Sequence, residues 1–346
     1  MTNTAHGSVP GATPGTGAPA GDVNRMPGMR PRVGVSSCLL GEPVRYNGGH
    51  SRSRFLTDQL SRHVDWVPFC PEIEIGLGAP RAPLRLATGG RLVSSAGDED
   101  HTAAVAAAVT ACRGQLNELS GYIFKSRSPS CGLSSAREYS GGRPVRGGAR
   151  GAFAGRVLGA CPMLPAEEEG RLNDPVLREA FVEQVFARAR LLALFSGPWR
   201  LRDLVSFHSR HKLQLLAHDP VRYRASGRLV AAARQQAPEE VQSRYMALYA
   251  GALSRRATTG RHADALHHAY GMISKLLDQA RRHDILTVIG AYRRHEVPLS
   301  VPVALIRHHA VAGGAGYLAG QTYLDPFPAS LGLRNYVAGA EGAQHG

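Results

Sequence analysis

Long apolar runs are missing from this chain of 346 residues. No stretch approaches the roughly 20 consecutive apolar residues that a membrane-spanning helix needs. The N-terminus also lacks the basic segment followed by an apolar segment that marks a secretory signal. Together, the two absences predict a cytoplasmic protein that has no membrane partner.

Cysteine is scarce, and its number is odd. The 5 cysteines are Cys38, Cys70, Cys112, Cys131 and Cys161. An odd number in a chain without a secretory signal argues against a disulfide framework. In a reducing compartment the thiols are left for metal binding, for catalysis or for simple burial.

Lysine is nearly absent too, although the chain is strongly basic. It has 3 Lys beside 38 Arg, and its formal net charge is +14. Such a charge suits a polyanionic partner such as nucleic acid, although a codon bias towards Arg explains part of the excess. Residues 200–346 carry 19 Lys and Arg against 10 Asp and Glu, and 11 of the 15 His. We therefore expect any nucleic-acid-binding part to lie in the C-terminal half.

The first half of the chain has the pattern of an α/β domain. Residues 1–30 are rich in Gly, Pro, Ala and Thr without apolar periodicity, which predicts a disordered tail. Strands and helices then alternate, which predicts a parallel sheet with flanking helices over residues 31–168. The predicted strands are 32–37, 64–69 and 121–125, and the predicted helices are 54–62 and 102–119.

Strand signals almost vanish in the second half. Asp174 followed by Pro175 is typical of a helix N-terminus. We predict a connecting helix or linker over 169–199, an all-α domain over 200–335 and a loose tail over 336–346. The further helices predicted from apolar periodicity are 201–217, 238–254, 262–282, 283–295 and 300–310.

Three of the cysteines occupy equivalent positions, because Cys38, Cys70 and Cys131 each follow the end of a predicted strand. The carboxyl ends of parallel strands face one crevice, so these thiols are expected to converge there. No C-x2-C pair is present, which argues against zinc-ribbon and ferredoxin patterns. Spacing alone leaves open a shared metal or cluster and three separately buried thiols. Cys112 and Cys161 have no such placement, and we predict that they are structural.

Sequence blocks around these cysteines carry a family resemblance. The blocks are GVSSCLLGEPVRYNGG (34–49), VPFCPEIEIGLGAPRAPLRL (67–86) and FKSRSPSCG (124–132). They resemble the signature blocks of the thiouracil desulfidase family, and the resemblance spans residues 31–165. It implies an α/β domain with a 4Fe–4S cluster held by three cysteines and one open iron. The implied ligands are Cys38, Cys70 and Cys131.

The helical half resembles a second family, a helical domain without an assigned function. The matching blocks are HKLQLLAHDPVRY (211–223), HADALHHAYG (262–271), YRRHEVPLSVPVALIRHH (292–309) and YLAGQTYLDPFP (317–328). The two-domain arrangement is similar to bacterial tRNA 4-thiouridine desulfidases, in which the helical domain is thought to help hold the tRNA. The resemblance implies iron–sulfur-dependent conversion of 4-thiouridine in tRNA to uridine, with release of hydrosulfide.

Other functions remain open at this point. The same site could act on free 2-thiouracil or another small thiopyrimidine. The chain could instead be a non-catalytic nucleic-acid-binding protein with a structural metal site, or a zinc hydrolase or deaminase that uses the same three cysteines. The oligomeric state does not follow from the sequence.

Candidate catalytic residues lie next to the proposed ligands. Glu72 follows Cys70 by two positions and is the first candidate for the general base, although a loop-capping role is the alternative. Glu74 would share its face if the segment were extended. Ser128 and Ser130 precede Cys131; of the two, we favour Ser128 for orienting the water or the base, and hydrogen bonding within the turn is the alternative.

Candidate substrate-binding residues follow the first cysteine and flank the other two blocks. Arg45, Tyr46 and Asn47 lie on the loop after Cys38 and suit stacking on, or hydrogen bonding to, an extruded base. Arg81 and Lys125 are candidate phosphate contacts, and a plain surface charge is the alternative for each. The histidine groups of the helical half, such as His208, His211 and His218, are read as packing or phosphate-contacting residues rather than as a metal site.

Overall fold

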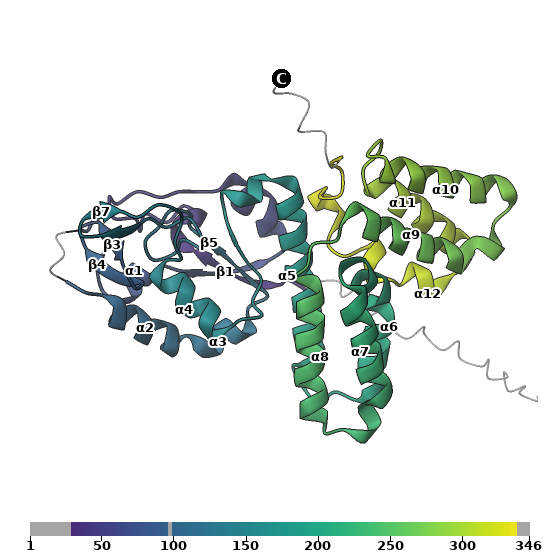
Figure 1. Ribbon diagram of the computed structural model, residues 1–346, viewed down its shortest axis with the longest axis horizontal. Helices are drawn as coiled ribbons and strands as arrows, with labels where there is room; N and C mark the ends of the chain where they lie inside the picture. Colours follow the sequence, from purple (N-terminus) through teal and green to yellow (C-terminus); the bar gives the residue numbers. More distant parts are fainter. Residues whose placement is uncertain (1–28, 96–98, 338–346) are drawn as a thin grey trace, which may run out of the picture.

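The computed structural model describes residues 29–95 and 99–337. An α/β domain and a helical region lie on either side of a long helix, α5 (Figure 1). Residues 1–28 and 338–346, which make up most of the two predicted tails, lie outside the described residues. Arg30, predicted to belong to the first tail, forms an ion pair with Asp65 and donates to the carbonyl groups of Ser61, Arg62 and Val64.

The α/β domain is built on a four-stranded parallel sheet in the order β2-β1-β5-β8. The strands are β1 (Arg32–Ser36), β2 (Asp65–Phe69), β5 (Gly121–Phe124) and β8 (Ala166–Glu168). The predicted parallel sheet is therefore confirmed. Strand β1 is central because Val33 and Val35 are fully buried and suit a pleated interior. Gly34 lies between them, where a Cβ would crowd the ring of Tyr122 and stand 2.8 Å from Leu119 Cδ1.

A second, smaller sheet was not predicted. Its order is β4-β3-β6-β7, with antiparallel pairing at both ends and parallel pairing of β3 with β6. The strands are β3 (Leu84–Ala87), β4 (Arg91–Ser94), β6 (Glu138–Ser140) and β7 (Arg143–Pro144). These strands are too short to show an alternating pattern. The available signal was the Gly-Gly pair in each hairpin turn, at 89–90 and 141–142, where every glycine has a positive φ.

The helices of the α/β domain differ from the predicted helices mainly in where they are interrupted. The elements are a π-helical turn (Phe55–Gln59), a 3₁₀ turn (Leu60–Arg62), α1 (Pro71–Glu74), α2 (Thr102–Ala111), α3 (Arg113–Glu118) and α4 (Ala152–Ala160). The helix predicted over 102–119 is interrupted at Cys112, and α4 was missed. Gly155 and Gly159 lower the helix propensity of α4, so its helical conformation depends on tertiary packing.

The helical region is all-α within the described residues, as predicted. Its helices are α5 (Pro175–Phe195), α6 (Leu201–His218), α7 (Pro220–Ala232), α8 (Pro238–Leu253), α9 (Thr259–Ile273), α10 (Gln279–Arg293), α11 (Ser300–Ala312) and α12 (Gly316–Ala319). Helix α7 was missed, although Asp219-Pro220 marks its start as Asp174-Pro175 marks that of α5. The break predicted at 282–283 is wrong, because Asp278 caps α10 by accepting from the Arg281 N–H. Among the described helices none has the length and apolar character to cross a membrane.

Helix α5 and the C-terminal segment join the two parts. Phe181 and Val185 of α5 pack into the core cluster of the α/β domain, whereas Leu191 packs into the core of the helical region. Phe327 and Leu333, which follow the last helix, return to the α/β core cluster. The interface is therefore apolar and shared, which favours one fixed arrangement of the two parts.

A buried ion-pair network lies at this joint. The guanidinium of Arg334, with 7% of the residue exposed, donates to Glu179 Oε1 at 3.1 Å and to Glu183 Oε2 at 3.4 Å. Its remaining terminal nitrogen donates to the carbonyl oxygen of Tyr323 at 2.7 Å. Two carboxylates of α5 are thus neutralised by a cation from the far end of the chain.

Arg334→Ala is expected to lower the free energy of unfolding by about 3–5 kcal/mol, because it leaves the buried Glu179 without its cation and the buried Glu183 with His218 alone. Arg244→Ala is the matched control, since it removes an arginine from an exposed pair with Glu240 and should cost less than about 1 kcal/mol. Urea unfolding of both variants measures the difference. Equal losses of unfolding free energy in the two variants would show that the buried network stabilises the fold no more than an exposed ion pair does.

Candidate functional site

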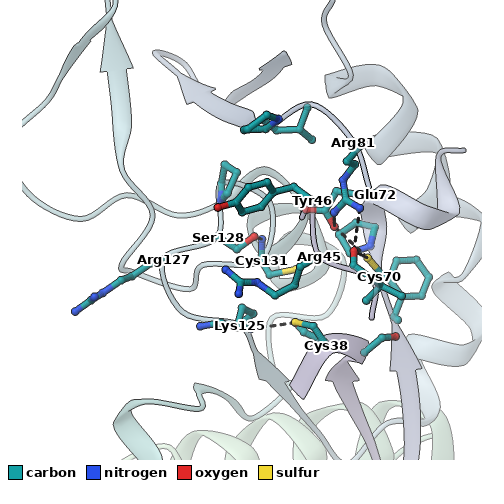
Figure 2. A pocket seen from close by; sticks show the side chains of 18 of the residues that line it. Cys38, Arg45, Tyr46, Cys70, Glu72, Arg81, Lys125, Arg127, Ser128 and Cys131 are labelled. Carbon is teal, nitrogen blue, oxygen red and sulfur yellow. Dashed lines mark hydrogen bonds and ion pairs between the residues drawn. The ribbon is translucent and has the colours of Figure 1, made fainter. Parts of the chain in front are cut away.

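The carboxyl ends of β1, β2 and β5 open on a cavity of about 420 Å³ (Figure 2). This volume is in the range of small-molecule pockets. The proposed ligands Cys38, Cys70 and Cys131 line it, as do most of the other candidate site residues, whereas the candidates Asn47, Glu74 and Ser130 do not. The lining residues are Ser36, Ser37, Cys38, Val44, Arg45, Tyr46, Phe69, Cys70, Pro71, Glu72, Arg81, Pro83, Leu84, Lys125, Ser126, Arg127, Ser128, Pro129 and Cys131.

The three strand-end cysteines share this cavity. Cys38 lies in the turn after β1, Cys70 directly follows β2, and Cys131 lies on the loop after β5. Cys38 and Cys131 are buried, and Cys70 is partly exposed. The parallel sheet thus brings together thiols that are 93 residues apart at the extremes (131 − 38). Cys112 and Cys161 pack in the hydrophobic core of the α/β domain instead.

Burial shapes the chemistry of these thiols. It raises the pKa of Cys38 to about 11, although the nearby cations of Lys125 and Arg45 act in the opposite direction. Burial and the carboxylate of Glu72 raise the pKa of Cys70 to about 12, and the pKa of Cys131 is also raised, chiefly by burial. At neutral pH the free thiols are therefore protonated, and binding of a metal group must release their protons.

Three thiols are the kind of donor set that an iron–sulfur cluster takes. Across residues 29–95 and 99–337, no group of three or more His, Cys, Asp or Glu side chains is placed to hold one metal ion. A single zinc ion needs its sulfur ligands about 2.3 Å from one point. A cluster instead binds each thiolate to a different iron, so the thiolates stand further apart. Three cysteines line the described cavity wall without a fourth Cys or a His, which would leave one iron without a protein thiolate.

Glu72 lies at the centre of a hydrogen-bond group in the cavity wall. It is 8% exposed, and its Oε2 accepts from the Cys70 thiol at 3.3 Å. The Ser130 hydroxyl donates to Oε1, and the Arg81 guanidinium lies 3.8 Å from Oε2. Glu74 is exposed and does not share this environment. The expectation that it shares the face of Glu72 is wrong, because Pro71–Glu74 is a helical turn rather than an extended segment.

The two serines before Cys131 differ in their contacts. Ser128 Oγ accepts from the backbone N–H of Cys131 at 3.1 Å and of Ser130 at 3.3 Å, which shapes the turn. Ser130 is fully buried, and its hydroxyl makes the direct contact to Glu72. The hydroxyls of the two serines lie 2.9 Å apart, so they form one chain that ends on the carboxylate. Sequence reasoning considered both and favoured Ser128.

The loop after Cys38 covers the cavity mouth. Tyr46 is 45% exposed, and the Arg45 guanidinium lies 5.8 Å from the centre of its ring. Both line the cavity and lie near its opening (Figure 2). Asn47 does not line it; its Oδ1 accepts from the Gly49 N–H at 3.2 Å and so stabilises the loop.

The two candidate phosphate contacts are already engaged. Arg81 donates to the carbonyl oxygens of Val44 at 2.9 Å and Gly78 at 2.7 Å, which fixes its guanidinium near Glu72. The ammonium of Lys125 lies 2.5 Å from Glu169 Oε1. Their positive charges still face the cavity, where they favour anionic sulfur.

Three of the histidines of the helical region, His208, His211 and His218, are buried in its core. His208 Nδ1 lies 3.2 Å from the hydroxyl of Tyr245, His211 Nδ1 lies 2.7 Å from the carbonyl oxygen of Phe207, and His218 Nδ1 lies 2.6 Å from that of Arg255. These bonds agree with the packing interpretation.

Comparison with known proteins identifies the two parts. Residues 33–169 match the family described as 2-thiouracil desulfurase, and residues 212–328 match a family described as a protein of unknown function, DUF1722. The chain thus carries a domain of the 2-thiouracil desulfurase family followed by a DUF1722 domain. The first of these matches supports desulfuration of thiouracil.

Individual proteins are similar to parts of this chain. The uncharacterized protein YbgA of Escherichia coli is 32% identical over 166 residues, which is 48% of this chain and 95% of YbgA. The uncharacterized protein YbbK of Bacillus subtilis is 36% identical over 112 residues, which is 28% of this chain and 71% of YbbK. Among solved structures, the [4Fe-4S]-dependent thiouracil desulfidase TudS is 29% identical with a TM-score of 0.37, and the match covers 44% of this chain and 100% of that one.

Gly151→Ala is expected to distort the turn that carries Cys131 and to lower the free energy of unfolding by about 1–3 kcal/mol. A Cβ at Gly151 would overlap the carbonyl group of Ser130 and lie 3.0 Å from Gly132 N. Gly159→Ala, in the same helix with open space around it, is the control and should stabilise by up to about 1 kcal/mol. Urea unfolding compares the two variants. An unchanged free energy of unfolding in Gly151→Ala would contradict the tight packing of this turn.

Proposed function

We propose that the chain is a cytoplasmic enzyme that removes sulfur from 4-thiouridine in tRNA and releases hydrosulfide, with a 4Fe–4S cluster on Cys38, Cys70 and Cys131. The observation that carries the proposal is the meeting of these three thiols in one cavity with a buried carboxylate. The overall reaction replaces a C=S bond by a C=O bond with one water, so no electron donor is needed. When bound, the cluster would supply an iron Lewis acid for the soft thiocarbonyl sulfur.

Glu72 and Ser130 supply the proton path in this proposal. Attack of water on the thiocarbonyl carbon requires a base, and the Glu72 carboxylate lines the cavity beside Cys70. The Ser130 hydroxyl donates to this carboxylate and so fixes its orientation. Ser128, hydrogen-bonded to Ser130, extends the path to the cavity surface and keeps its proposed role in orienting the water. Arg81 holds the carboxylate from the opposite side.

The mouth of the cavity supplies the contacts to the pyrimidine. Tyr46 offers a flat exposed ring on which an extruded base can stack, and Arg45 beside it offers hydrogen-bond donors. An RNA substrate also agrees with the net charge of +14. Within the loop, Asn47 acts on the base only indirectly, by holding the turn.

Free 2-thiouracil is the second candidate substrate. A cavity of about 420 Å³ accepts a free base as readily as an extruded one, and the family is described by that base. Hydrosulfide release from free 2-thiouracil and from thiolated tRNA, measured side by side after anaerobic reconstitution, tells the two apart. A non-catalytic protein with a structural metal would release hydrosulfide from neither.

Replacement of any one proposed ligand tests the cluster assignment. Cys38→Ala, Cys70→Ala and Cys131→Ala are each expected to abolish visible iron–sulfur absorbance and hydrosulfide release, because each removes one of only three thiolates. Cys112→Ala should retain both, since Cys112 packs in the core away from the cavity. Loss of iron in Cys112→Ala, or its retention in the other three variants, would overturn the ligand assignment.

Glu72→Gln tests the proposed base without changing the size of the side chain. It should retain the cluster and lower kcat by about 10²–10⁴-fold, the range that a general base contributes. Glu74→Gln is the control, because Glu74 is exposed and outside the cavity. Normal turnover by a cluster-loaded Glu72→Gln enzyme would exclude the role.

A further inference from the structure

A second cavity, of about 370 Å³, lies in the helical region. It is enclosed by the first half of α5, the start of α9, the end of α10 and the C-terminal segment. Its lining residues are Asp174, Val176, Glu179, Ala180, Glu183, His218, Arg256, Ala257, Thr258, Thr259, His262, Tyr292, Leu299, Arg334 and Tyr336. The cavity is separate from the cysteine site, with which it shares no lining residue.

The inner wall of this cavity is rigid and charge-balanced. Arg334 bridges Glu179 and Glu183, and His218 Nε2 lies 3.4 Å from Glu183 Oε1. Gln214 donates to the same carboxylate at 2.7 Å. A wall whose charges are already paired does not by itself attract an ion, so any ligand must be recognised by the groups that remain.

His262 is the polar group of this wall that lacks a partner on one side. It is 9% exposed, and its Nδ1 lies 3.0 Å from the Tyr323 hydroxyl. The same hydroxyl lies 3.4 Å from the backbone carbonyl oxygen of His262; when it donates there, Nδ1 is the donor in the first contact and Nε2 is an acceptor. No hydrogen bond to Nε2 occurs within the described part of the chain. Burial lowers the pKa of His262 to about 3, so the ring stays neutral and offers this acceptor to a ligand N–H.

The lining also includes a cation without a partner among the described residues, Arg256, and the Asp174 carboxylate, which accepts from the Val176 and Leu177 N–H groups. Arg256 is exposed, and within the described residues it has no ion pair or hydrogen bond. Thr258 and Thr259 follow it at the N-terminus of α9, a helix of 15 residues. The Thr258 side chain accepts from the Arg261 N–H, which leaves earlier amide groups of the first turn without an intrahelical acceptor. Such a combination suits a phosphate group.

Two tyrosines complete the cavity between these polar ends. Tyr292, 8% exposed, comes from α10, and Tyr336 comes from the C-terminal segment. Aromatic rings of this kind accept the flat face of a nucleobase whatever its identity. The ligand that matches an aromatic surface, a buried acceptor and a phosphate site in one cavity of this size is a nucleotide.

We propose that this cavity binds one unpaired nucleotide, with its base at Tyr292 and His262 and its phosphate at Arg256 and the α9 N-terminus. The inference deepens the proposed action on tRNA and rests on it for the source of the nucleotide. It gives the helical region a specific role, because an anchored nucleotide would hold the RNA while a different nucleotide reaches the cysteine site.

The test uses the full chain and measures binding instead of turnover. Adenosine 5′-monophosphate is titrated calorimetrically, and the same nucleotide competes with a fluorescently labelled single-stranded oligoadenylate in an anisotropy assay. The variants are Arg256→Ala and His262→Phe, each checked by circular dichroism. Arg228→Ala, which removes an exposed arginine of α7 outside the cavity, matches the charge change. Cys38→Ala disables the proposed desulfuration site and leaves this cavity intact.

The proposal is supported if the chain binds one nucleotide and Arg256→Ala lowers the affinity about tenfold or more. The affinity should be unchanged in Arg228→Ala and Cys38→Ala. Competition with the oligonucleotide would assign the site to RNA, and binding without competition would assign it to a free nucleotide. Loss of binding in Cys38→Ala would place the nucleotide in the other cavity and overturn the inference, as would equal affinity of Arg256→Ala and the native chain. If His262→Phe does not fold, Arg256→Ala still decides. Because hydrosulfide release is not the readout, failure here leaves the proposed desulfuration standing.

Discussion

The parallel pairing of β1 with both β2 and β5 is the constraint on which the site depends. It aligns the carboxyl ends of three strands, so the residues that follow them must meet in one crevice. Gly34 makes the close packing beneath β1 possible, since a side chain there would collide with Tyr122. Cys38, Cys70 and Cys131 share a cavity because of this alignment, although none lies near another in the sequence.

Burial of the thiols has a cost that the cavity offsets. The low-dielectric wall disfavours thiolates, which agrees with the raised pKa of Cys38 and Cys70. Arginine and lysine side chains around the cavity act the other way and support the anionic sulfur that a metal group requires. Glu72 and Ser130 are both buried and are hydrogen-bonded to each other beside the cavity. The proposed cofactor ligands and the proposed acid–base groups therefore share one small space.

Much of this arrangement could be predicted from the sequence, and the failures have physical causes. The alternation of strand and helix patterns predicted the parallel sheet, and the strand-end positions of the cysteines predicted that they line one cavity. The second sheet was missed because strands of two to four residues show no periodicity, although the Gly-Gly turns at 89–90 and 141–142 marked its hairpins. The contact of Ser130 with Glu72 joins residues 58 positions apart, which no local pattern reveals. For the same reason, no local sequence pattern indicates the pairing of Arg334 with α5.

The central claim is that three thiols of one cavity hold an iron–sulfur cluster that acts on a thiocarbonyl group. Its most direct test is anaerobic reconstitution with iron and sulfide, followed by simultaneous measurement of iron per chain and of hydrosulfide released from thiolated tRNA and from 2-thiouracil. We expect about four irons per chain and, from at least one of the two compounds, equal amounts of hydrosulfide and desulfurated base. A fully loaded protein that releases no hydrosulfide from either compound would contradict the account.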